Sequence, residues 1–148
     1  MLKLTYSIDI AADAGKIWRV LFEKHSYEQW ASPFAEGSTY TGTMAQGERI
    51  KFHNGTYEGM YADVERLSAE EYVEFRHIGM LGKNGEELPL DEEAKKWSGA
   101  LETYRLTKSV KGVLLEVTVD SDESFVEYMN ETFPRALEIV RSLSEQQS

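Results

Sequence analysis

The sequence contains no cysteine among its 148 residues. This absence excludes disulfide bonds, zinc sites with cysteine ligands, thiol nucleophiles and thiol-based redox switches. Positive charge is also scarce, because 16 Lys and Arg residues stand against 26 Asp and Glu residues and the net charge is −10. A field of that sign repels phosphate backbones and anionic lipids, so we expect neither nucleic acid nor a membrane as a partner.

Long hydrophobic runs and targeting signals are missing as well. No stretch of ~18 apolar residues occurs, and Met1–Ile10 alternates polar and apolar residues instead of forming a continuous apolar segment. We therefore expect a cytoplasmic protein. The length and an apolar fraction of 41% are typical of one globular domain, here residues 1–148, and we expect it to be a monomer rather than a dimer.

Hydrophobic periodicity predicts an α+β fold. Leu2–Ile10 alternates as a strand, Asp13–Glu23 has apolar residues at helical spacing, and a shorter helical turn follows at Ser26–Trp30. Six more strands are predicted at Ser38–Met44, Arg49–His53, Tyr57–Leu67, Tyr72–Ile78, Ser98–Thr107 and Val113–Asp120. The segment His53-Asn54-Gly55-Thr56 predicts a tight hairpin, because Asn-Gly tolerates positive φ angles.

A long amphipathic helix is predicted over Asp122–Ser144, with Ser121 as its cap. Pro134 lies inside it and predicts a kink, because proline removes one backbone hydrogen bond. Strands joined by short turns should pair antiparallel, and the helix should bury its apolar stripe against that sheet. The stripe consists of Phe125, Met129, Phe133, Ala136, Val140 and Leu143.

Six segments together carry a family resemblance. In chain order they are Ile8-Asp9-Ile10-Ala11-Ala12 with Ile17-Trp18-Arg19-Val20-Leu21, then Trp30, then Gly47-Glu48-Arg49-Ile50-Lys51-Phe52, then Gly59 through Arg66-Leu67, then Trp97-Ser98-Gly99-Ala100-Leu101-Glu102-Thr103-Tyr104-Arg105-Leu106, and last Phe133-Pro134-Arg135-Ala136-Leu137. They resemble the START-like, or helix-grip (SRPBCC), superfamily, in the branch of the C-terminal domain of the activator of the heat-shock-protein-90 ATPase.

This resemblance implies a helix-grip fold, in which a curved antiparallel sheet of about seven strands wraps around a long kinked C-terminal helix, with two short helices after the first strand. It also implies a cavity between sheet and helix. Members of the superfamily bind apolar or aromatic small molecules, cyclise polyketides or dock on chaperones, and they share no single set of catalytic residues. The resemblance therefore implies a fold and a cavity but no particular reaction.

Glu102 is the first candidate for chemistry. It is predicted to face the cavity, because Ala100, Tyr104 and Leu106 lie on the same side of a strand. A carboxylate there needs hydrogen-bond donors, and its role is either structural or in ligand binding and acid–base chemistry. An exposed position is the third alternative.

The histidines are the second group of candidates. His77 shares a strand face with Val73 and Phe75 and is expected either to line the cavity or to be a hydrogen-bonded residue at the edge of the core. His53 adjoins the predicted hairpin tip and is expected to be exposed. The spacing of the histidines matches no metal-binding motif, so we expect no metal site and no cofactor.

Three functions follow from these features. The first is binding of an apolar or aromatic small molecule by Trp97, Tyr104, Glu102, His77, Phe75, Phe52, Met129 and Phe133. The second is an enzyme, a cyclase, dehydratase or hydrolase, with Glu102, His77 and Tyr104 as catalytic candidates. The third, from the resemblance alone, is a co-regulator of a chaperone ATPase.

The predicted connection Gly79–Lys96 is long for a link between neighbouring strands. It combines glycines and acidic residues with four apolar ones, and it ends at Trp97, a candidate lid residue. Two interpretations are open. In one, Met80, Leu81, Leu88 and Leu90 pack over the mouth of the cavity as a gate; in the other, the segment is an inert surface insertion.

Overall fold

The computed structural model describes residues 1–54 and 59–146. The elements, in chain order, are β1 (Leu2–Ile10), α1 (Ala14–Phe22), α2 (Lys24–Trp30), β2 (Thr39–Thr41), β3 (Arg49–His53), β4 (Gly59–Ser68), β5 (Tyr72–Leu81), α3 (Glu92–Trp97), β6 (Leu101–Lys108), β7 (Val113–Ser121), a 3₁₀ turn η1 (Glu123–Phe125) and α4 (Val126–Glu145). The chain is therefore α+β, as predicted. No helix in the described part is long and apolar enough to span a membrane.

The strands form one antiparallel sheet in the order β1-β7-β6-β5-β4-β3-β2. Strands that follow each other in the sequence pair from β2 to β7, including β5 and β6, although a long connection that contains α3 joins those two. The exception is β1, which pairs along its whole length with β7, from Leu2 opposite Ser121 to Ile10 opposite Val113. The turn predicted at residues 54–56 and the start of the strand predicted at Tyr57 lie largely outside the described residues.

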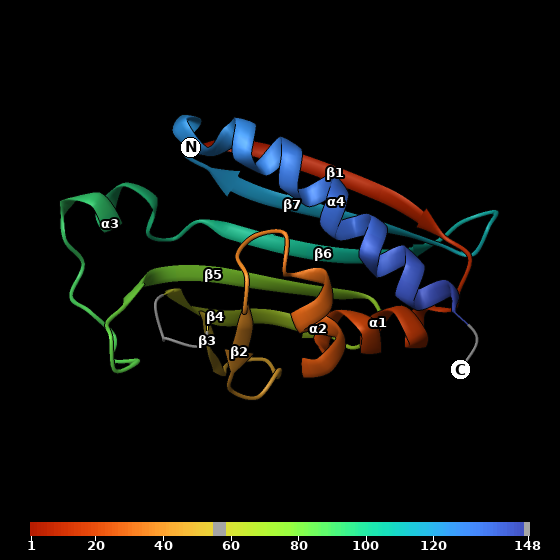
Figure 1. The fold of residues 1–148 in the computed structure, drawn as a ribbon, viewed down its shortest axis with the longest axis horizontal. Coiled ribbons are helices and arrows are strands. Elements are labelled where there is room, and N and C mark those ends of the chain that lie inside the picture. The colour runs from red at the N-terminus through yellow and green to blue at the C-terminus, as the bar shows by residue number, and fades with distance from the viewer. Residues whose placement is uncertain (55–58, 147–148) are drawn as a thin grey trace.

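All the long helices lie on one side of this sheet (Figure 1). Helix α4 lies across the β1 and β7 end, and α1 and α2 lie over the other strands; we call the covered side the inner face and the opposite side the outer face. One buried apolar cluster joins the three helices to the inner face, and Ile17, Trp30, Phe75, Leu115 and Val140 are among its members. Burial of this cluster is the main source of stability.

Local chemistry explains where three expectations fail. The predicted strand Ser38–Met44 shortens to β2 because Gly42 has a φ of +120° and its position leaves no room for a side chain beside the Arg49 carbonyl. Ser121 does not cap the last helix; its hydroxyl donates to the Asp122 carbonyl, and the Asp122 side chain accepts from the Ser124 N–H instead. The resulting 3₁₀ turn rotates Phe125 out of the apolar stripe, and that ring is 53% exposed.

A β-bulge in β5 determines which side chains reach the inner face. His77 pairs with Ala62 and Gly79 pairs with Tyr61, so Ile78 is an extra residue with no partner in β4. Such a residue reverses the alternation of faces beyond it. Phe75 and His77 therefore point inward, whereas Gly79 lies against Tyr61 on the outer face.

Candidate functional site

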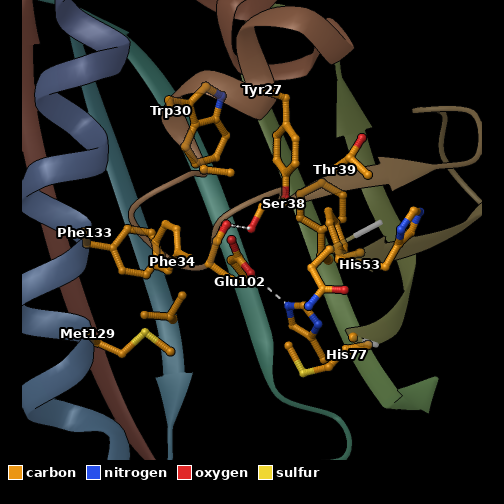
Figure 2. Close-up of a pocket in the computed structure, with 18 of the residues that line it drawn as sticks. Tyr27, Trp30, Phe34, Ser38, Thr39, His53, His77, Glu102, Met129 and Phe133 are labelled. Carbon is orange, nitrogen blue, oxygen red and sulfur yellow. Dashed lines mark hydrogen bonds and ion pairs between the residues drawn. The ribbon is translucent and has the colours of Figure 1, made fainter. Parts of the chain in front are cut away.

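A cavity of about 320 Å³ lies on the inner face, between the sheet, α2, α4 and the chain that links α2 to β2. This volume is at the small end of the ~300–1,000 Å³ range of ligand pockets. Figure 2 shows Phe133 and Met129 entering it from α4, Tyr27 and Trp30 from α2, and Glu102 and His77 from the sheet.

Nine of the 21 described lining residues are Phe, Tyr or Trp. Phe75 forms edge-to-face pairs with Phe22, Phe52 and Tyr104 at centroid distances of 5.4–6.3 Å. Tyr27 packs against Trp30 at 5.0 Å in the same geometry. Such interlocking rings hold their orientation, because each ring edge meets the face of another. The wall is therefore apolar and fixed in shape.

The polar part of the site is a hydrogen-bonded triad of His77, Glu102 and Tyr104. His77 Nε2 lies 2.8 Å from Glu102 Oε1, and the Tyr104 hydroxyl bonds to Glu102 Oε2. The three side chains come from β5 and β6, where Glu102 is opposite Phe75 in the register. His77 Nδ1 is buried and has no hydrogen-bond partner among the described residues.

Burial would by itself raise the pKa of the Glu102 carboxyl, but the hydrogen bond and charge of His77 and the hydrogen bond of Tyr104 outweigh it, and its pKa lies below the ordinary value. The carboxylate is therefore ionised at neutral pH and only accepts hydrogen bonds, so His77 donates from Nε2. Burial, and next the charge and hydrogen bond of Glu102, raise the pKa of Tyr104 well above its usual range.

The structure brings together all but one of the side chains predicted for the site. Tyr104, Glu102, His77, Phe75, Phe52, Met129 and Phe133 line the cavity. Trp97 is not among the described lining residues, so its predicted role in the site stays a prediction without support from this geometry. It ends α3, and α3 lies beyond the ends of β5 and β6, where Ser98 donates to the Ile78 carbonyl (Figure 1).

The gate interpretation finds no support in the geometry. None of residues 79–96 lines the cavity, and residues 85–90 contact the outer face of the sheet instead. There Lys51 donates to the Gly85 carbonyl, Arg49 pairs with Glu87 at 2.7 Å, and Leu90 lies against the backbone at Gly79. The physical reason is the bulge at Ile78, which turns the start of this connection away from the cavity.

Sequence reasoning missed several lining residues. His53 was expected to be exposed, but only 8% of its surface is accessible to solvent, because β2 and β4 flank it on both sides. Tyr27, Trp30 and Phe34 all line the cavity. Their spacing of three and four residues predicts a shared side of a helical segment, and this signal was available in the sequence.

A metal site has no support in the geometry. The described residues contain no group of three or more His, Asp or Glu side chains placed to hold a metal ion. His53 Nε2 lies 3.4 Å from the Thr41 hydroxyl.

Comparison with known proteins places the fold. No model of a known protein family matches the sequence, and no curated protein is significantly similar to it. Solved structures do match over the whole chain. Protein MLL2253 from Mesorhizobium loti has a TM-score of 0.76 at 14% identity, with 99% of each chain covered. The Aha1 dimer from Colwellia psychrerythraea has a TM-score of 0.70 at 18% identity, with 100% of each chain covered.

The chain has the START-like helix-grip fold. DynU16, a protein of the dynemicin biosynthetic locus, also matches, with a TM-score of 0.66 at 15% identity over 95% of this chain and 46% of its own. Identities this low show the fold alone. The Colwellia protein is described as a dimer, and our expectation of a monomer remains a prediction.

Proposed function

We propose that this helix-grip protein binds an apolar, aromatic small molecule in the cavity between the sheet, α2 and α4. The observation that carries the proposal is the cavity itself: a space of about 320 Å³ lined largely by aromatic and apolar side chains, with a hydrogen-bonded polar group formed by His77, Glu102 and Tyr104 in its wall. An apolar wall with a few fixed polar groups is the usual composition of a small-molecule site.

Mass spectrometry under non-denaturing conditions tests this proposal on freshly purified protein. We expect a retained small molecule at one copy per chain, and after its removal we expect binding of naphthalene, measured by calorimetry. Met129→Trp should abolish both, because an indole at that wall position fills the space that the ligand needs. Val110→Trp is the matched control, since Val110 is fully exposed and lies outside the cavity.

Two results would contradict the proposal. One is a purified protein that neither retains a molecule nor binds naphthalene. The other is binding that Met129→Trp leaves unchanged, provided that the variant melts within a few degrees of the parent protein. The second result would place the ligand elsewhere on the molecule.

A second candidate function is an enzyme, and one observation favours it. His77, Glu102 and Tyr104 meet at one point of the cavity wall, as acid–base catalysis by these three groups requires. If the protein is a dehydratase or a hydrolase, the retained molecule should lose or gain the mass of water during incubation. If it is a cyclase, ring closure without loss of water leaves the mass unchanged and should appear as a new chromatographic retention time. Glu102→Gln should stop that change. A ligand that is released unaltered after long incubation would favour the binding protein.

Docking on a chaperone ATPase remains a prediction from the resemblance. A pull-down of the purified protein against a purified chaperone tests it. No binding at micromolar concentrations would count against this third function.

A further inference from the structure

The charges around the cavity are unbalanced. Among its lining residues that the structure describes, none is Lys or Arg, and Glu102 alone carries a carboxylate. The carboxylate is ionised at neutral pH, as argued above, and its two partners donate through an imidazole N–H and a phenol O–H. No Lys or Arg in the described wall offsets this charge, so the cavity is net negative whenever the His77 imidazole is neutral.

Glu102 retains capacity to accept hydrogen bonds from a ligand. A carboxylate has about four lone-pair positions, and His77 and Tyr104 occupy two of them. Its side chain is 22% exposed, and that exposed part faces the cavity. Hydrogen bonds to an ionised acceptor are about twice as strong as those between neutral groups. A ligand that brings an N–H or O–H group to this oxygen gains such a bond.

A second unsatisfied group lies nearby. Tyr27 points from α2 into the cavity, and its hydroxyl has no hydrogen-bond partner among the described residues (Figure 2). Burial, and then the charge of Glu102 and the nearby Tyr40, raise the pKa of Tyr27, so the hydroxyl keeps its proton. Trp30 and Tyr40 hold the ring edge-to-face at 5.0 Å each. Tyr27 can therefore donate to, or accept from, the same polar group of a ligand.

Binding of an acidic ligand in this cavity should be unfavourable. Its carboxylate would bring a second negative charge into a desolvated space beside Glu102, with no Lys or Arg side chain in the described wall to pair with it. Burial of an unpaired charge is strongly unfavourable, and like charges at short distance add to the penalty. The apolar wall alone would accept many molecules, so these polar groups determine which are selected.

We propose that the cavity selects aromatic molecules that carry a hydrogen-bond donor, as a phenol or an amine does, and excludes aromatic carboxylates. This inference rests on the proposed binding function and adds the chemical class of the ligand. The donor points at Glu102, and the ring system packs among Phe75, Trp30 and Phe133.

Four probes of one ring size test the selection by calorimetry at about pH 8, where an aromatic carboxylate is fully ionised. They are naphthalene, 2-naphthol, 2-naphthylmethylamine and 2-naphthoate. We expect naphthol and the amine to bind at least tenfold tighter than naphthalene, and naphthoate at least tenfold weaker. A difference between naphthol and the amine would show whether the site prefers a neutral donor or a cation.

Glu102→Gln separates the carboxylate from the rest of the wall, because glutamine keeps the shape and removes the charge. In this variant the preference for naphthol over naphthoate should shrink at least tenfold, while naphthalene affinity changes less than threefold. The matched control is Glu74→Gln. Tyr72 donates to Glu74 two residues along β5, as Tyr104 does to Glu102 on β6, but Glu74 lies outside the cavity. This control should leave all four affinities unchanged.

Tyr27→Phe gives a second variant that keeps the ring. It should weaken naphthol about threefold or more and leave naphthalene unchanged. The selection is contradicted if naphthalene binds but naphthoate binds as tightly as naphthol, or if Glu102→Gln leaves their order and ratio unchanged; the proposed binding function stands in both cases. If none of the four probes binds, not even naphthalene, the proposed function itself fails and the inference falls with it.

Discussion

Two connecting segments of this protein both carry apolar residues but lie on opposite faces of the sheet. Residues 31–38 link α2 to β2 and border the cavity through Ala31, Phe34 and Ala35. Residues 82–91 link β5 to α3 and lie on the outer face, where Glu87 pairs with Arg49. Both carry apolar residues among polar ones. Apolar content therefore indicates that a connection packs on the sheet, but it does not indicate which face it covers.

The difference comes from the elements at each end. Phe34 continues the side of α2 that carries Trp30, and its ring meets Phe133 edge-to-face at 4.8 Å. Residues 82–91 follow the bulge at Ile78, which directs the chain to the outer face before the connection begins. The first segment is joined to α4 and the second to the sheet, so we expect only the first to respond to a ligand.

The largest expected effect on stability comes from removing one ring of the aromatic wall. Phe75 is 1% exposed and contacts three other rings on the inner face. Phe75→Ala should lower the free energy of unfolding by about 3–5 kcal/mol, because it removes buried surface and leaves a cavity. Chemical denaturation measures this loss. Val110→Ala, at a fully exposed site, should change stability by less than about 0.5 kcal/mol. A loss below 1 kcal/mol for Phe75→Ala would show that the inner face is loosely packed.

Alkaline pH should produce the next largest effect. Burial raises the pKa of Tyr27, Tyr40 and Tyr104 in the folded protein. These groups keep their protons when folded, whereas unfolded tyrosines ionise at about pH 10. Their contribution to stability is present below that pH and is lost as pH rises above it. Urea unfolding at increasing pH should show a decline that starts near pH 10, and it should be shallower in Tyr27→Phe. An equally steep decline in that variant would contradict the assignment.

The link between residues 31–38 and α4 should contribute less to the free energy of unfolding. The Tyr128 hydroxyl donates to the Phe34 carbonyl at 2.5 Å, in a partly exposed position. Tyr128→Phe should cost about 0.5–1.5 kcal/mol and speed amide exchange in residues 31–38. Tyr6→Phe is the control, because it removes a hydroxyl that bonds to Asn130 of α4 at 2.7 Å and does not touch this segment. Equal acceleration in both variants would mean that the whole helix has loosened.

Charged groups on the outer face should contribute still less to the free energy of unfolding. Arg49 pairs with Asp63 at 2.7 Å and with Glu87, but its side chain is 39% exposed. Arg49→Met should therefore cost at most about 1 kcal/mol. Because the hydrogen bond and charge of Arg49 lower the pKa of Asp63, the variant should raise that pKa toward its ordinary value, as NMR titration can measure. An unchanged Asp63 titration would show that Arg76, at 3.6 Å, dominates instead.

Features that follow from local periodicity, such as the face on which a strand residue lies, could be predicted from the sequence. Features that depend on pairing between segments far apart in the sequence could not. Alternation located β1 and β3 and placed Glu102 and His77 on the inner face, since each residue's face follows from its neighbours. The bulge at Ile78 and the pairing of β1 with β7 depend on register between separate segments. No local pattern encodes that register, and the position of residues 82–91 and the burial of His53 were missed for this reason.

The smallest expected effect is that of Leu90→Ala on ligand affinity, and it tests most directly whether the two connecting segments differ in their link to the cavity. Leu90 is 37% exposed and lies against Gly79 and Tyr61 on the outer face, on the opposite side of the sheet from the cavity. Leu90→Ala should leave the affinity for naphthalene within about twofold of the parent protein, because none of residues 82–91 lines the cavity. Phe34→Ala, the corresponding change in residues 31–38, should weaken binding at least tenfold by opening the wall beside Phe133. Hydrogen exchange with and without naphthalene should agree, with added protection in residues 31–38 and none in residues 82–91. If Leu90→Ala weakened binding as much as Phe34→Ala, residues 82–91 would be coupled to the cavity through the sheet. These residues would then control ligand binding without lining the cavity.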